Sequence, residues 1–388
     1  MIFMDIFLAI ATSFLIGFLI TPILVRVLKK MQIMDAPGGR KIHDGFIPSM
    51  GGVAIIVATF ISIFSWFQYQ QLLEIRYFLA AFALIFFIGL RDDMVDLTAV
   101  QKLIGQLVAT YMVVIMSDIR ISSLYGFMGV YELPLLISYA ITFFTIIALT
   151  NSFNLIDGLD GLAGTISLIT FLFLGWWFIN AGVESYGLFA LILVGGIVSF
   201  LMFNWHPAKI FMGDTGSLSL GFALSTLTVL FIDTNGTMSE FQGWKFYAPI
   251  ASGVALLIIP VYDTARIFTK RALKGKSPMA PDKGHVHHFL LRMGMRHDQV
   301  TLTLGLIKIA FIVLIFAAHN LNDHILLPIV ILSALAMGFR LDAITLKRVK
   351  EICRTSPPVL SINQKPKYLS KKPVIQSKIL RNAKISNN

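Results

Sequence analysis

The sequence is nearly free of cysteine and has little charge. Its one cysteine, Cys353, excludes both a disulfide framework and a cysteine-based metal cluster. Charged residues make up 14% of the 388 residues, whereas about 25% is usual in a soluble domain. The 56% of hydrophobic residues give a mean hydropathy of +0.77 and fall in repeated runs of about 20 residues. This pattern predicts an all-α, polytopic integral membrane protein.

The apolar runs predict eleven membrane-spanning helices, or ten if the shortest run does not cross. They lie at about 2–28, 50–68, 77–90, 102–117, 133–150, 164–180, 187–203, 216–232, 247–267, 301–318 and 325–340. The first run is too long for the apolar core of a signal peptide, so we expect it to be retained. Residues 1–340 are expected to form one transmembrane domain. Residues 341–388 are expected to form a basic, disordered cytoplasmic tail.

Basic residues are distributed unequally between the two sides of the predicted membrane domain. Of 32 lysines and arginines, the side that holds the N-terminus has only Arg76, Arg120 and Lys245, and Lys308 falls inside a span. The positive-inside rule therefore places the other side in the cytoplasm. The polar, motif-like connections all fall on this cytoplasmic side, at 35–52, 91–102, 151–164, 204–217 and 268–300. We expect them to converge on one active site at the inner face of the membrane.

The connection 151–164 carries the densest group of polar side chains, in the sequence NSFNLIDGLDGLAG. It contains Asn151, Asn154, Asp157 and Asp160, with three glycines that permit close approach of a ligand. An unpaired carboxylate in hydrocarbon costs several kcal/mol, so this segment must face water or a protein-walled cavity. A polar turn that only caps the next helix would need one such aspartate. We therefore interpret the segment as part of an active-site floor.

The segment RDDMVD at 91–96 brings three carboxylates together, those of Asp92, Asp93 and Asp96. Carboxylates at this spacing repel one another unless a cation or a proton relieves the charge. Oxygen ligands of this kind suit Mg²⁺ or Mn²⁺ rather than zinc. An acidic membrane-flanking loop is the simpler alternative, but short cytoplasmic loops favour basic residues. Lys102 follows where the next helix begins, and we favour a functional site.

The segment NWHPAKIFMGDTGS at 204–217 places Asp214 where a helix is expected to begin. Backbone amides at a helix N-terminus, together with small residues, form a seat for phosphate. A carboxylate in the same turn can hold the metal that the phosphates bridge. Phe211 offers a flat apolar face that can stack on a base, and packing at the membrane interface explains it equally well.

Further charged groups lie in two connections and one span. The longest connection, 268–300, is rich in lysine and arginine and contains the motif HVHH, which supplies His285, His287 and His288. Without cysteine and with few acids nearby, these histidines suit phosphate oxygens or a sugar better than a transition-metal cluster. Lys41 lies in a cationic turn that a topogenic signal explains equally well. Asp263 and Arg266, three residues apart in one span, are expected to pair with each other.

Taken together, these motifs resemble the polyprenyl-phosphate N-acetylhexosamine-1-phosphate transferases. The resemblance covers about residues 1–340 and rests on RKIHDGFIPSMGG at 40–52, DDMVD at 92–96, NLIDGLDGLAG at 154–164, NWHPAKIFMGDTGS at 204–217 and HVHH at 285–288. It implies transfer of a sugar-1-phosphate from a UDP-sugar to undecaprenyl phosphate, with release of UMP and with Mg²⁺ or Mn²⁺ as cofactor. HVHH is more similar to the branch that uses UDP-N-acetylglucosamine than to the muramoyl-pentapeptide branch, which has consecutive histidines there.

The resemblance also implies roles for individual residues. Asp214 would ligate the metal with Asp93 beside it, and Asp92 or Asp93 would deprotonate the lipid phosphate or attack directly. Asp96 and Asp160 complete the predicted catalytic set. The predicted substrate-binding residues are Lys41 and Lys102 for the phosphates, Asn154, Asp157 and Phe211 for the uridine, His285, His287 and His288 for the sugar and diphosphate, and Asn151 as a further contact.

The expected partners are a UDP-sugar, undecaprenyl phosphate and the lipid bilayer, without nucleic acid, and the sequence is compatible with a homodimer. The resemblance implies a multi-pass protein of the bacterial inner membrane that initiates a lipid-linked cell-envelope glycan such as lipopolysaccharide. One alternative is the phospho-N-acetylmuramoyl-pentapeptide transferase of peptidoglycan synthesis. A transporter of phosphorylated sugars or divalent cations is more remote, because transporters place polar groups near the bilayer midplane.

Overall fold

The computed structural model describes residues 2–33, 47–240, 243–273, 275 and 285–355, and this part of the chain is almost entirely helical. Within it there is no β-strand, and an isolated bridge joins Ser123 and Glu132. The helices are α1 (Ile2–Lys30), α2 (Gly52–Trp66), α3 (Tyr69–Met94), α4 (Ala99–Tyr111), α5 (Leu135–Asn154), α6 (Leu162–Asn180), α7 (Glu184–Asn204), α8 (Gly213–Thr237), α9 (Pro249–Leu256), α10 (Ile258–Ala272), α11 (Val286–Arg292), α12 (His297–Ala317) and α13 (Asp323–Thr355). A π-helical turn, Met112–Met116, continues α4.

The predicted spans correspond to helices of the structure, so the all-α membrane architecture is confirmed. Nine helices in the described residues are long and apolar enough to cross a membrane, and α9 with α10 makes a tenth if that bent pair is one span. The remaining predicted span is α2, an apolar helix of 15 residues. The span expected at 247–267 is bent by 79° between α9 and α10. Pro260 explains the bend, because it has no N–H for the carbonyl of Leu256 and its ring clashes with that carbonyl.

The chain divides into two compact units, Met1–Leu346 and Lys347–Asn388. The first unit contains the helical bundle. Of the second, the described residues are the last turns of α13, in which Arg348 and Glu351 form an ion pair across 3.8 Å. Helix α13 is thus continuous past residue 340, where the tail was expected to begin, and charge pairs of this spacing support an exposed helix.

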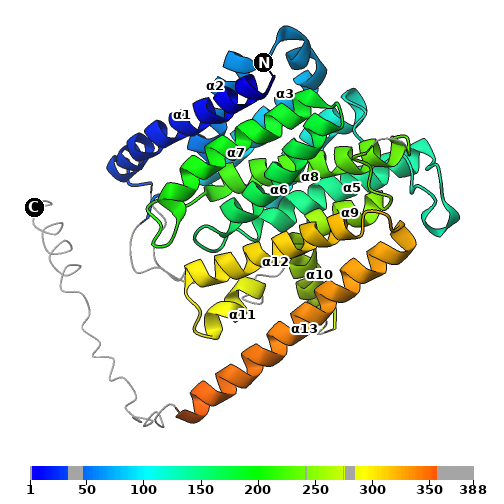
Figure 1. Cartoon of the computed structure of the whole chain (residues 1–388). Helices are drawn as coiled ribbons and strands as arrows, with labels where there is room; N and C mark the ends of the chain where they lie inside the picture. The colour runs from blue at the N-terminus through cyan, green and yellow to red at the C-terminus, as the bar shows by residue number, and fades with distance from the viewer. Residues whose placement is uncertain (1, 34–46, 241–242, 274, 276–284, 356–388) are drawn as a thin grey trace, which may run out of the picture. The chain divides into compact units, whose positions relative to one another are not determined.

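Helix α8 lies in the middle of the bundle and packs against α2, α3, α5, α6 and α9 (Figure 1). Of its most apolar 18-residue window, 94% is buried, against 22% for α1 on the outside of the bundle. A helix that is buried on all sides can hold polar groups at its end only where neighbouring helix ends supply partners. The N-terminus of α8 is such an end, and it carries Asp214.

Glycines bring three helices into close contact at the N-terminus of α8. A Cβ atom added at Gly52 of α2 would lie 2.1 Å from the backbone nitrogen of Gly216. A Cβ atom at Gly89 of α3 would lie 2.6 Å from the carbonyl oxygen of Asp214. Only glycine permits such an approach of backbone to backbone. The ends of α2 and α3 are therefore fixed against the turn that carries Asp214.

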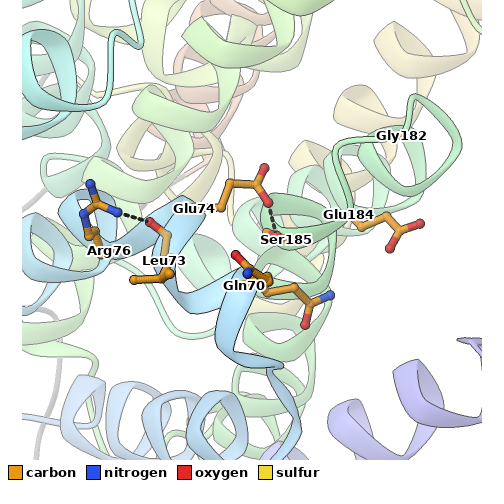
Figure 2. A pocket seen from close by; sticks show the side chains of 8 residues that line it. Gln70, Leu73, Glu74, Arg76, Gly182, Glu184 and Ser185 are labelled. Carbon is orange, nitrogen blue, oxygen red and sulfur yellow. Dashed lines mark hydrogen bonds between the residues drawn. The ribbon is translucent and has the colours of Figure 1, made fainter.

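The opposite end of α3 borders a pocket of about 600 Å³ together with the start of α7 (Figure 2). In this pocket the hydroxyl of Ser185 donates a hydrogen bond to Glu74, and Arg76 donates one to the carbonyl of Leu73. None of the residues predicted for the active site lines it. The predicted site residues that the structure describes gather at the other end of the bundle.

Candidate active site

Asp214 is the centre of a polar cluster made by four helices. Lys102, in the first turn of α4, places its Nζ 2.7 Å from one carboxylate oxygen of Asp214 and also forms an ion pair with Asp92. Asn154, the last residue of α5, donates from its Nδ2 to the other carboxylate oxygen of Asp214 at 2.9 Å and to the hydroxyl of Ser217 at 2.8 Å. The predicted residues Asp92, Lys102, Asn154 and Asp214 are therefore in contact.

Asp93 has a different surrounding from Asp92. Its Oδ1 accepts the backbone N–H of Asp214 at 2.7 Å, and its Oδ2 accepts the N–H of Thr215 at 2.9 Å and the Thr215 hydroxyl. Asp93 therefore caps the N-terminus of α8, where a carboxylate also interacts favourably with the helix dipole. Gly213 has φ +72°, and a Cβ there would lie 2.6 Å from Asp93. The amides that the sequence suggested for a phosphate are bonded to Asp93 instead.

The carboxylates of Asp92 and Asp214 interact with each other as well as with Lys102. Two carboxylates this close need a positive charge between them, and the Lys102 ammonium occupies that position. Carboxylate and amide oxygens are the ligands that Mg²⁺ and Mn²⁺ prefer. The carboxylates of Asp214 and Asp92 thus fit the divalent cation that the resemblance implies.

Asn151 lies one turn before Asn154 on α5 and faces another partner. Its Nδ2 donates to the side chain of Gln106 at 2.8 Å, and the Gln106 amide donates back at 3.3 Å. This reciprocal pair joins α5 to α4 one helical turn from Lys102. Gln106 is buried and was not predicted from the sequence, although its spacing of four residues from Lys102 places both on one face of α4.

Asp157 and Asp160 both lie in the turn after α5, but their surroundings differ. Asp157 is half-buried, whereas Asp160 is buried and its Oδ2 lies 2.7 Å from Nδ1 of His206 and 3.3 Å from Nδ1 of His297. These three residues form a group whose ligand-type atoms lie within 4.8 Å of one another. Thr301 of α12 also donates to the Asp160 carbonyl at 2.9 Å. Asp160 therefore ties the turn to α12 and to the segment before α8, and neither histidine was predicted.

The HVHH histidines lie at the start of α11, on the other side of the same turn. His285 and His287 are buried, with parallel rings whose centroids are 5.6 Å apart, and His288 is half-buried. A Cβ at Gly158 would lie 3.0 Å from Nε2 of His287. Burial, with the neighbouring His288, lowers the pKa of His287 to about 3. His287 is therefore neutral at physiological pH and packs against the turn.

Two of the remaining predicted residues, Asp96 and Phe211, lie away from the centre of the Asp214 cluster, and a third is outside the described residues. Asp96 is exposed beyond the end of α3, because the helix stops at Met94 instead of continuing for another turn. Phe211 is half-buried, and its backbone N–H donates to the carbonyl of Pro48 at 2.9 Å. This bond joins the end of the first connection to the segment before α8. Lys41 lies outside the described residues.

The turn 154–161 thus touches each part of the site: Asn154 contacts the cluster at Asp214, Gly158 lies against His287, and Asp160 contacts His206 and His297. The prediction that separate connections meet at one end of the bundle is confirmed for the described residues. The arrangement offers carboxylates for a divalent cation, a lysine for phosphate charge, and neutral imidazole for hydrogen bonds to a sugar.

Comparison with known proteins identifies the family. Residues 75–232 match the family described as glycosyl transferase family 4. The chain is 32% identical over 311 residues to the probable undecaprenyl-phosphate N-acetylglucosaminyl 1-phosphate transferase of Bacillus subtilis, which covers 78% of this chain and 82% of that relative. It is 30% identical over 371 residues to the undecaprenyl-phosphate alpha-N-acetylglucosaminyl 1-phosphate transferase of Escherichia coli O157:H7, covering 89% of this chain and 96% of that protein. In agreement with the resemblance of its motifs, the chain belongs to glycosyl transferase family 4.

Proposed function

We propose that this protein transfers N-acetylglucosamine-1-phosphate from UDP-N-acetylglucosamine to undecaprenyl phosphate. An oxygen of the acceptor phosphate forms a bond to the phosphorus that carries the sugar. The bond from that phosphorus to the bridging oxygen of the diphosphate breaks, and UMP leaves. The product is a lipid-linked sugar diphosphate that starts a cell-envelope glycan. The family and the names of the relatives support this choice of reaction.

The observation that carries the proposal is the contact of Lys102 with both Asp92 and Asp214 beside the N-terminus of α8. Phosphoryl transfer requires positioned substrates and neutralised charge more than covalent chemistry. Lys102 would hold the diphosphate charge, and Asn154 would keep Asp214 oriented. Asp92 would take the proton of the acceptor phosphate. Its Oδ1 accepts the backbone N–H of Leu97 and its Oδ2 pairs with the side chain of Lys102, whereas both oxygens of Asp93 are held by the backbone of α8.

Asp214 would hold a Mg²⁺ or Mn²⁺ ion, with Asp92 and Asn154 beside it. When bound, such an ion supplies positive charge to the diphosphate oxygens as the bridging bond breaks. His285, His287 and His288 would contact the sugar and diphosphate, and Asp157 and Phe211 would hold the uridine.

The site would lie at the cytoplasmic face of the inner membrane, because the basic residues are concentrated on that side of the predicted spans. The nucleotide sugar would then arrive from the cytosol and the lipid phosphate laterally from the bilayer.

The test is a donor assay with purified protein, undecaprenyl phosphate, Mg²⁺ and one UDP-sugar at a time, in which UMP release is measured. We expect turnover with UDP-N-acetylglucosamine and none after chelation of the metal. Turnover only with UDP-N-acetylmuramoyl-pentapeptide would assign the chain to the sibling branch. If the protein moved phosphorylated sugars or divalent cations across vesicles without releasing UMP, it would be a transporter. Asp214→Asn serves as the inactive control.

A further inference from the structure

The carboxylate of Asp263 on α10 contacts two consecutive residues at the start of α11. Its Oδ2 lies 2.7 Å from Nδ1 of His285, and its Oδ1 accepts the backbone N–H of Val286 at 2.8 Å. Asp263 is 3% exposed and His285 is 8% exposed, so water competes little for these contacts. The pairing of Asp263 with Arg266 expected from the sequence is replaced by two separate pairs, since Arg266 contacts Asp342 of α13.

The chemistry of this pair determines which ring nitrogen of His285 meets a ligand. An ionised carboxylate can only accept hydrogen bonds, so Nδ1 of His285 must carry a proton. In the neutral ring, the lone pair is then on Nε2, at the opposite edge. His285 stacks on His287, which lies against Gly158 of the turn 154–161. Through His287, the fixed imidazole is therefore connected to the turn that carries Asn154 and Asp157.

We propose that Asp263 is a positioning residue that fixes the tautomer and orientation of His285, leaving Nε2 to accept a hydrogen bond from the hydroxyl or acetamido N–H groups of the donor sugar. This inference rests on the proposed function and assigns a task to a residue outside its catalytic set. The carboxylate acts through the imidazole, as a carboxylate does wherever it orients a working histidine.

Asp263→Asn tests the tautomer directly. The amide oxygen can still accept from Val286, but the amide NH₂ then faces Nδ1 of His285 and drives the ring proton to Nε2. We expect kcat/KM for UDP-N-acetylglucosamine to fall by about 10- to 100-fold, as is typical for a partner that orients a working histidine. The KM for undecaprenyl phosphate should stay unchanged, because His285 is proposed to contact the donor sugar and not the acceptor. A general loss of structure would instead change the KM values of both substrates.

Two further variants separate the imidazole contact from simple capping of α11. Val286→Pro removes the N–H that Asp263 accepts and exchanges one partly buried apolar side chain for another. Proline is tolerated at the first position of a helix, and His285 already has φ −63° and ψ 148°. We expect near-normal kcat/KM for this variant. In a His285→Ala background, Asp263→Asn should add less than about a two-fold loss, since the two residues act as one unit.

The matched control is Asp323→Asn, at the opposite end of the bundle. Asp323 is 4% exposed, and its carboxylate also accepts two backbone N–H groups, those of Ile250 and Ala251. Replacing the Asp323 carboxylate by an amide should leave kcat/KM unchanged. Should Asp263→Asn not fold, Asp263→Glu in the same cycle should show a smaller, His285-dependent loss.

Three results would overturn the inference: a normal Asp263→Asn enzyme, a Val286→Pro enzyme as impaired as Asp263→Asn, or a full additional loss in the His285→Ala background. Wild-type protein that turned over no UDP-sugar would overturn the proposed function and this inference together. If the wild type were active and Asp263→Asn had the same kcat/KM, only this inference would be overturned.

Discussion

Asp92 and Asp93 are adjacent in sequence and chemically identical, yet they have different partners. Consecutive residues of a helix point about 100° apart, so Asp92 faces Lys102 on α4 while Asp93 faces the start of α8. Asp93 bonds to the backbone of the residue that carries the central carboxylate. The role as a metal ligand or base that the resemblance implies for Asp93 therefore competes with a role in holding Asp214 in place.

Asparagine substitutions should separate these two aspartates. We expect Asp93→Asn and Asp214→Asn each to abolish turnover. Only Asp93→Asn should also lower the free energy of unfolding, by about 1–2 kcal/mol, because an amide cannot accept both backbone N–H groups of the α8 cap. Asp214→Asn relieves the repulsion with Asp92 but also removes the ion pair with Lys102, so its melting temperature should change little. Thermal melts in detergent check this, and equal melting temperatures would contradict the capping role.

His287 should make the protein acid-sensitive. Its pKa is lowered to about 3 in the folded protein, whereas an unfolded histidine titrates near pH 6.5. The unfolded state therefore binds a proton more readily below pH 6.5, and stability is lost as the pH falls from 6.5 towards 3. At pH 5 the loss amounts to about 2 kcal/mol relative to pH 7. Melting temperatures of wild type and His287→Gln at pH 7.5 and 5.0 measure it. A wild-type curve no steeper than that of the variant would contradict the assignment.

The residue types of the site were predictable from the sequence, but several partners were not. Asp92, Lys102, Asn154 and Asp214 could be grouped because each lies at the end of an apolar run, and the ends of successive runs share a side. Gln106 could not be singled out, because its pairing with Asn151 depends on how α4 and α5 are rotated about their axes. The same holds for His206 and His297, which meet Asp160 only after three separate segments have packed.

At the scale of elements, span length and composition located the helices well, and backbone chemistry modified them. The bend between α9 and α10 follows from Pro260, and the length of the apolar run 247–267 does not reveal it. The close approach of α2 and α3 to α8 follows from Gly52 and Gly89. Such contacts are visible only once two helices are placed together, since a glycine in one apolar run does not indicate which other run it meets.

Substitution of Gly52 should loosen the helix contact that fixes the N-terminus of α8. A methyl group there would lie 2.1 Å from the nitrogen of Gly216, and backbone cannot rotate away as a side chain can. We expect Gly52→Ala to cost about 1–3 kcal/mol of stability and to lower turnover as well. Gly243→Ala is the matched control, because nothing lies within 4 Å of its added methyl group. Equal melting temperatures for the two variants would show that α2 and α8 can separate freely.

At the scale of the whole molecule, the charge pattern and the positions of the polar contacts agree. The described polar segments that carry the site lie at one end of the first unit, the end at which α3 stops and α8 starts. The sequence assigns most basic residues to the connections at this end. The positive-inside rule predicts that this end faces the cytoplasm.

Cysteine labelling along α3 tests this orientation. Gln70 and Val95 are both exposed and lie at opposite ends of the 26-residue helix, which at 1.5 Å per residue is longer than the hydrocarbon core of about 30 Å. In a Cys353→Ser background that retains turnover, Gln70→Cys should react with a membrane-impermeant maleimide in intact cells. Val95→Cys should react only after the inner membrane is opened, because its end of α3 carries Asp92 and Asp93 and must be reached by a cytosolic nucleotide sugar.

Two labelling patterns would contradict this orientation of α3. The reverse pattern would place the site outside the cell and exclude a cytosolic donor. Labelling of both cysteines from one side would show that α3 does not cross the membrane.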